Sequence, residues 1–286
     1  MLHGILHTSM TDPLLPEAIA LNGANSSGPD GTQFSSGRAA HWLSIHHYSD
    51  FSNRHPQTTT LDYYICRMGR GAYVLMKSPT NSVEHDFFSA HDYLFSKSIP
   101  AIRYYSEASE RDLLAFSLMR ATMDEEQSLA HLLLATGALH NALGLERPHS
   151  TIMPPTSKTG GNFDFKVKNH NGTDYKFAGA GQIEVDLIVS GIQDKRVKLY
   201  VIEAKKKGKK DIANWKFLFP AVLVKSGLGV VNRGLVDVIP TYLHSYIEDG
   251  FIHFDLATFS PITNQPIDIV KPSFTSTRGL VKDPAK

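Results

Sequence analysis

The alternation of apolar and polar residues is clearest over residues 182–210, where it predicts two strands joined by a turn. Successive side chains of a strand point to opposite faces of the sheet. In the first strand, Glu184 and Asp186 therefore share one face, and apolar residues line the other. In the second strand, Glu203 and Lys205 follow an apolar run and also share one face. The pattern thus places two acids together on the first strand, and an acid and a lysine together on the second.

A turn between these strands is indicated by Gly191 and the polar run 193–196. A short polar link of this kind lets neighbouring segments pair as a hairpin. Pairing would bring the carboxylates of Asp186 and Glu203 within reach of one cation. Crowded carboxylates repel and raise one another's pKa unless a divalent cation neutralises them. Mg²⁺ meets this demand, because it prefers oxygen ligands, keeps several waters and completes its shell with substrate phosphate.

Lys205 lies two residues after Glu203, where its ammonium group could orient or deprotonate an attacking water and offset charge on a phosphate. The residues therefore point to phosphodiester hydrolysis. A basic cluster follows directly, and we expect it to touch backbone phosphate without reading sequence; it consists of Lys206, Lys207, Lys209 and Lys210. A lysine run is also typical of a solvated strand end.

Asp186, followed by Glu203-Ala204-Lys205 at the end of the next strand, resembles the motif of the PD-(D/E)xK nuclease superfamily. The resemblance is strong over residues 182–210 and reaches the flanking helices only through the order of the elements. It implies a restriction-endonuclease-like core, Asp186 and Glu203 as ligands of Mg²⁺ or Mn²⁺, and Lys205 as the catalytic lysine. Val185 stands where the motif's proline would be, a departure that many members share.

Some members of that superfamily add a metal-binding glutamate from a preceding helix. Leucines at helical spacing predict one helix over residues 124–143, ending at Gly144. Glu126 and Glu125 lie at its start and are both candidates for this ligand. An acid in the first turn also stabilises a helix by itself, so the helix-borne ligand stays open.

The whole pattern predicts an α/β protein, with a mixed central sheet flanked by helices and an N-terminal extension before the core. Residues 1–38 are rich in Gly, Ser, Asn and Pro, which predicts a flexible arm. Residues 39–100 are expected to form an accessory segment with a small sheet, residues 101–270 the nuclease-like core, and residues 271–286 a polar tail. Within the core we expect a buried crossover helix over residues 212–225 and a strand pair around the turn 248–250.

Composition limits the class of protein and the compartment in which it is expected. The 286 residues are 42% hydrophobic, which suits a globular core, and the net charge of +1 leaves nucleic-acid affinity to local clustering. The single cysteine, Cys66, excludes an intrachain disulfide and suits a reducing compartment, the cytosol or nucleus. No run reaches the ~18 apolar residues that a bilayer requires, and the N-terminus lacks a signal-peptide pattern. We therefore expect an intracellular protein with no membrane partner.

We predict a metal-dependent endonuclease that hydrolyses nucleic-acid phosphodiester bonds, with DNA favoured over RNA by family frequency alone. A homodimer is implied only by the resemblance, since cutting both strands of a duplex often needs two active sites. Two alternatives stay open. One is a catalytically silent nuclease-fold module that binds nucleic acid or protein, and the other is an unrelated α/β domain whose lysines form an import or phosphate-binding patch. Binding of a divalent metal distinguishes these possibilities, because the nuclease needs a metal and the lysine patch does not.

Overall fold

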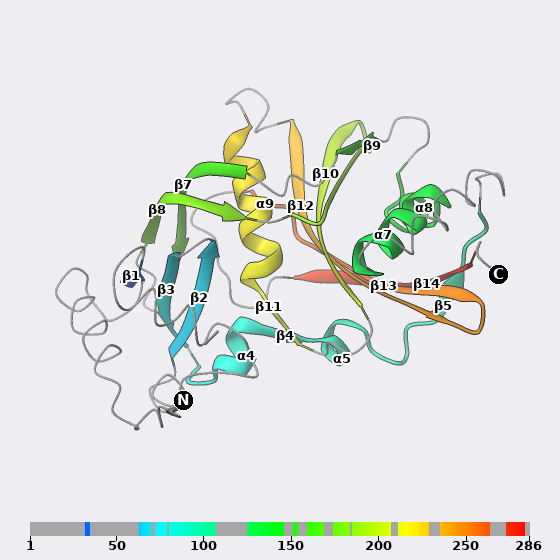
Figure 1. Ribbon diagram of the computed structural model, residues 1–286, viewed down its shortest axis with the longest axis horizontal. Coiled ribbons are helices and arrows are strands. Elements are labelled where there is room, and N and C mark those ends of the chain that lie inside the picture. The colour runs from blue at the N-terminus through cyan, green and yellow to red at the C-terminus, as the bar shows by residue number, and fades with distance from the viewer. Residues whose placement is uncertain are drawn as a thin grey trace, which may run out of the picture.

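The computed structural model has a mixed α/β fold built on a central sheet with helices on both faces (Figure 1). The structure describes residues 32–34, 63–69, 72–78, 80–106, 125–145, 151–153, 159–168, 174–183, 185–206, 211–228, 235–263 and 273–283. The flexible arm predicted for residues 1–38 lies outside this set except for strand β1 (Thr32–Phe34).

The central sheet contains seven strands within the described residues, in the order β5-β14-β13-β12-β10-β9-β6. Strands β10 and β12 are parallel, β14 and β5 are parallel, and the other neighbours are antiparallel. The predicted mixed sheet is therefore confirmed. Its strands are β5 (Ala101–Arg103), β6 (Thr151–Met153), β9 (Leu187–Gln193), β10 (Arg196–Lys206), β12 (Val236–Glu248), β13 (Phe251–Phe259) and β14 (Phe274–Lys282).

Helix α9 (Trp215–Gly227) connects the parallel strands β10 and β12, as the predicted crossover helix requires. It packs on the sheet face that carries Val201, Val238 and Phe259. Helices α7 (Glu125–Ala135) and α8 (Ala138–Ala142) pack on the opposite face, against Ile202 and Leu243 (Figure 1). The sheet thus separates two hydrophobic cores. Because side chains alternate along a strand, Val201 of β10 lies in the core on the α9 side and Ile202 lies in the core on the α7–α8 side.

The hairpin of β9 and β10 matches the prediction, with its two-residue turn at Asp194 and Lys195. Both turn residues have positive φ, 52° and 62°, which is the backbone of a tight hairpin turn. Gly191 lies inside β9 and not in the turn as predicted. A Cβ there would stand 2.7 Å from Cδ2 of Leu145. Gly191 therefore allows close packing against Leu145, which follows α8, and does not reverse the chain.

The predicted single helix over residues 124–143 is two helices. The chain breaks at Gly137, which has a φ of 82° that glycine adopts without a steric penalty. The predicted apolar stripe is nevertheless buried; it consists of Leu129, Leu132, Leu133, Leu139 and Leu143. The helix was therefore wrong in length but right in the face that it buries.

The polar tail predicted for residues 271–286 is a second difference. Strand β14 occupies residues 274–282 and pairs with β13 on one side and β5 on the other. It contributes Val281 to the core, fully buried, and places Gly279 beneath the ring of Phe254. These residues belong to the central sheet.

Smaller sheets surround the α9 side. The predicted N-terminal sheet is present as β2 (Tyr63–Gly69) and β3 (Ala72–Lys77), with β1 added at its edge. A separate hairpin consists of strands β7 (Thr159–Lys168) and β8 (Asp174–Ile183). Strand β4 (Phe88–Ala90) pairs with β11 (Asp211–Ala213).

The short helices α4 (Val83–Phe87) and α5 (His91–Leu94) are tied to the α9 side of the sheet by polar contacts. Asn214, which precedes α9, donates through Nδ2 to the Asp86 carbonyl at 3.2 Å and accepts from Ser89 Oγ at 2.7 Å. Asp86 itself is buried and accepts hydrogen bonds from Ser78 and from Thr80. Because these groups are satisfied, the segment fixes the position of His91 above the sheet.

A charged cluster at the start of β10 and β12 yields a pH prediction. Arg196 donates to Asp237 at 3.0 and 2.7 Å, and Lys198 donates at 3.0 Å. The hydrogen bond from Arg196 is the main cause that lowers the pKa of Asp237 to about 2. A lowered pKa gives stability that is present above the unfolded-state pKa of about 4 and lost as the pH falls through the folded value.

We expect Asp237→Asn to lower the free energy of unfolding at pH 7 and to narrow its difference from the wild type between about pH 4 and pH 2. Urea unfolding at several pH values measures this. An unchanged difference across that window would contradict the assignment.

Candidate active site

Asp186, Glu203 and Lys205 converge at the end of the β9–β10 hairpin that lies opposite its turn. The last paired residues are Leu187 and Ile202, so Asp186 and Glu203 stand opposite each other just beyond them. Asp186 lies in a bend before β9 and not inside a strand as predicted. The chain leaves the β7–β8 hairpin there to enter the central sheet.

The carboxylate of Asp186 is held by the backbone of the neighbouring strand. Its Oδ2 accepts a hydrogen bond from the Ala204 backbone N–H at 2.8 Å. The Lys205 Nζ lies 2.7 Å from Oε1 of Glu203 and 3.9 Å from Oδ2 of Asp186, and it donates to the Ala204 carbonyl at 2.6 Å. The side chains of Lys205, Glu203 and Asp186 are 11%, 14% and 25% exposed. One ammonium group therefore contacts both acids in a largely buried position.

Burial raises the pKa of Glu203 to about 7; Lys205 opposes that rise, and the negative charge of Asp186 adds to it. Lys216 of α9 also opposes it and lines a small depression beside Glu203 together with Phe217 and Pro220. Lys216 was not singled out from the sequence. The ammonium group of Lys216, on the crossover helix, therefore acts electrostatically on the Glu203 carboxylate.

The donor set of this site fits a hard divalent cation. Asp186 and Glu203 offer carboxylate oxygens on facing positions, and burial together with the charge of Asp186 penalises the anionic form of Glu203. A cation of the Mg²⁺ type would neutralise such a pair, and it would keep coordination positions for water and phosphate beside these ligands. The residues present are therefore compatible with the cofactor that the sequence predicted.

Several predicted site residues lie outside the described part of the chain. These are Glu184 and the lysines Lys207, Lys209 and Lys210. Lys206 is the last residue of β10, and its side chain is half-buried. Glu125 and Glu126 begin α7, but their side chains are not among the described ones. The buried leucines of α7 pack on the face opposite to Glu203.

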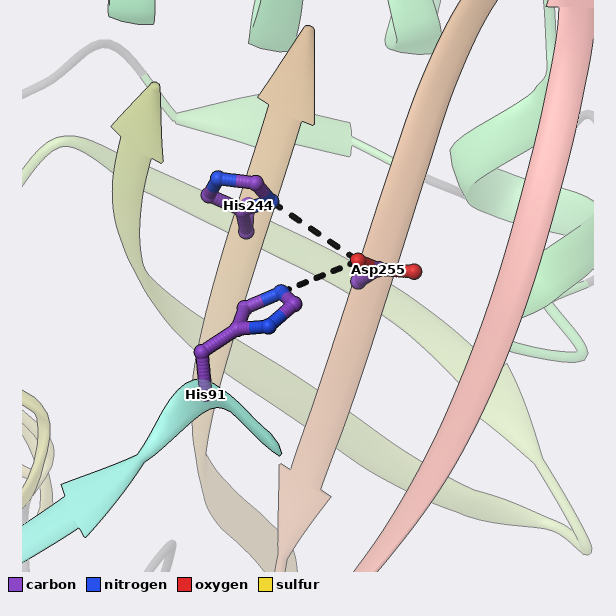
Figure 2. A group of neighbouring side chains, drawn as sticks. All are labelled: His91, His244 and Asp255. Carbon is purple, nitrogen blue, oxygen red and sulfur yellow. Dashed lines mark hydrogen bonds and ion pairs between the residues drawn. The ribbon is translucent and has the colours of Figure 1, made fainter. Parts of the chain in front are cut away.

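A second polar group, which was not predicted from the sequence, lies on the same face of the sheet. It joins His91 of α5, His244 of β12 and Asp255 of β13 (Figure 2). The His91 Nε2 lies 3.0 Å from Oδ2 of Asp255, and the His244 Nδ1 lies 3.7 Å from the same oxygen. Arg278 Nε donates to the other oxygen, Oδ1, at 3.0 Å. An acid within the apolar run of β13 is the signal that could have identified it.

The strand register connects the two groups. Lys205 pairs with His244, His244 with Asp255, and Asp255 with Arg278, across four neighbouring strands. Residues that pair in register share a face, so a row of charged and polar side chains runs from Lys205, beside the acidic pair, to Arg278 on β14, the neighbour of the edge strand β5. Asp186 and Glu203 occupy the row beside it, where Glu203 pairs with Tyr242.

Comparison with protein families gives a match over part of the chain. The sequence profile of a family described as a domain of unknown function, DUF6997, matches residues 90–265, which is more than half of the chain. No curated protein and no solved structure matches the chain. Within the described residues, no helix combines the length and apolar character needed to span a membrane.

Proposed function

The chain belongs to the DUF6997 family, and we propose that it is a metal-dependent nuclease that hydrolyses phosphodiester bonds of nucleic acid, with DNA as the favoured substrate. The observation that carries this proposal is the convergence of one lysine on two facing carboxylates. The Lys205 Nζ lies 2.7 Å from Glu203 and 3.9 Å from Asp186. These are the residues of the Asp…Glu-x-Lys motif, and they meet as a hydrolytic site requires.

The order of elements supports the same proposal. A helix precedes the strand that follows Asp186, the Glu-x-Lys strand pairs with it, and a buried crossover helix leads to a parallel strand. This order is the one that the resemblance to PD-(D/E)xK nucleases implies. The mixed sheet is thus compatible with a restriction-endonuclease-like core, which is part of the proposal.

In this proposal each residue has a separate role. Asp186 and Glu203 would hold Mg²⁺ or Mn²⁺, which when bound activates water and neutralises charge on the phosphate. The Ala204 N–H fixes the Asp186 carboxylate in place. Lys205 stands next to both acids, where its ammonium group can orient the attacking water through a hydrogen bond and offset negative charge as it develops. Lys216 adds positive charge from α9.

The alternative is a nuclease-fold module that binds nucleic acid or protein without cutting. It is favoured by the short ion pair of Lys205 and Glu203, which already neutralises much of the carboxylate charge without a metal. The two functions differ in their dependence on divalent cations, because only hydrolysis requires one.

Cleavage of supercoiled plasmid, single-stranded DNA and RNA, with Mg²⁺, Mn²⁺ or EDTA, tests the proposal. We expect cutting with either metal and none with EDTA. Asp186→Asn keeps the shape of the side chain but removes its charge, and we expect it to abolish cutting. Asp194→Asn is the matched control, since Asp194 lies in the turn at the other end of the same hairpin. If no substrate is cut under any condition, the catalytic proposal fails and the binding module remains.

A further inference from the structure

We propose that His91, His244 and Asp255 form a second metal site, specific for a divalent transition ion such as Zn²⁺ and separate from the acidic pair. One ligand atom from each residue lies within 4.8 Å of the other two, and His244 and Asp255 are buried. Figure 2 shows the two imidazole rings directed toward the same carboxylate. Two histidines and one carboxylate are a ligand set of catalytic zinc sites and of other transition-metal centres.

The strongest sign of a ligand is the Nδ1 of His244. It is buried without a hydrogen-bond partner, and the side chain is only 8% exposed. Its nearest acceptor, Oδ2 of Asp255, lies 3.7 Å away, which is too far for a hydrogen bond. A buried imidazole nitrogen without a partner costs free energy, and a metal between the three residues would remove that cost.

Arg278 orients the Asp255 carboxylate for this role by donating to its other oxygen, Oδ1. Arg278 Nε donates to Oδ1 of Asp255 at 3.0 Å, while its Nη2 donates to the Phe95 carbonyl at 3.2 Å. This arrangement fixes the carboxylate plane and leaves Oδ2 facing the histidines. Hydrogen-bonded groups that orient a ligand in this way are typical of metal sites.

The site differs in chemistry from the Asp186–Glu203 pair. Oxygen ligands favour Mg²⁺ and Mn²⁺, whereas imidazole favours Zn²⁺, Co²⁺ and related ions. It would also join two parts of the fold, because His91 comes from α5 and the other two ligands come from β12 and β13. A bound ion would therefore anchor α5 on the sheet beside Lys205.

The test is titration of EDTA-treated full-length protein with Co²⁺, followed through visible ligand-field absorption, and then displacement by Zn²⁺. We expect a saturable spectrum from the wild type that Zn²⁺ abolishes. His244→Phe keeps the ring contacts, and Asp255→Asn keeps the shape; both should lose this spectrum. His253→Gln is the control, because His253 lies on β13 two residues from Asp255 and outside the group.

Since the chain has 14 histidines, the difference between variants is the readout and not total cobalt binding. If His244→Phe or Asp255→Asn does not fold, His91→Gln carries the test, because His91 comes from a short helix outside the central sheet. Zn²⁺ should also raise the melting temperature of the wild type and of Asp186→Asn, but not of His91→Gln. A cobalt spectrum retained in His91→Gln, or none in the wild type, would overturn the site. Either result leaves the nuclease proposal untouched.

Discussion

Lys205→Met is expected to slow metal-dependent cleavage by about 10²- to 10⁴-fold, the range found when a group acting on a proton in the transition state is lost. Methionine keeps the length of the side chain and its packing, but it cannot donate to water or carry charge. The Lys205 Nζ contacts both Glu203 and Asp186. No neighbouring ammonium group on β10 can replace it, because Lys206 points to the other face.

Single-turnover cleavage at saturating Mg²⁺ measures this effect, with circular dichroism of each variant to show that it is folded. Lys282→Met is the control, since Lys282 is an exposed lysine at the end of β14. Removing Lys205 also leaves the Glu203 carboxylate buried beside Asp186 without its partner, so the variant should be less stable in EDTA than in Mg²⁺. A cleavage rate within about threefold of the wild type would remove Lys205 from the mechanism.

The nuclease-like residues could be predicted because they are close in sequence. Asp186, Glu203 and Lys205 lie on one hairpin, and alternation along β9 and β10 together with a short polar turn is enough to pair the strands. The same local logic predicted the strand pair β12–β13, whose turn at Asp249 and Gly250 has positive φ at both residues. In these segments the local pattern and the final fold agree.

The histidine site could not be predicted in this way, because it depends on contacts between distant segments. His91 and Asp255 are separated by 164 residues in the sequence. His91 follows β4, whose position is set by pairing with β11 and by Asn214. None of these contacts leaves a periodic signal around His91 itself, and the histidine therefore resembles any exposed one until the fold is known.

Strand β14 was missed for a related reason. Its sequence is rich in Thr, Ser, Arg and Gly, and its residues are mostly half-buried, so no apolar alternation marks it. Its place in the sheet comes from its neighbours: β13 pairs along its whole length, and Arg278 is drawn to Asp255. Where partners supply the stabilisation, a single sequence carries little of the information.

Phe254→Ala is expected to lower the free energy of unfolding by about 3–5 kcal/mol, the usual cost of removing a buried aromatic ring. Phe254 is 1% exposed and lies in the core between the sheet and α7–α8. Its ring stands over Gly279 of β14, and the Tyr104 ring lies 5.6 Å away. Because a side chain at position 279 would overlap both rings, this glycine makes the space that Phe254 fills.

The cavity left by Phe254→Ala cannot close easily, since Gly279 has no side chain to move into it and β13 and β14 are held by their ladder. Urea unfolding at constant pH measures the loss. Phe251→Ala is the matched control, because Phe251 begins the same strand and is only half-buried, and a smaller loss is expected there. Since Phe254 faces away from Asp255, the folded variant should keep its cobalt spectrum. A loss below about 1 kcal/mol would mean that this core repacks, and the role given to Gly279 would be wrong.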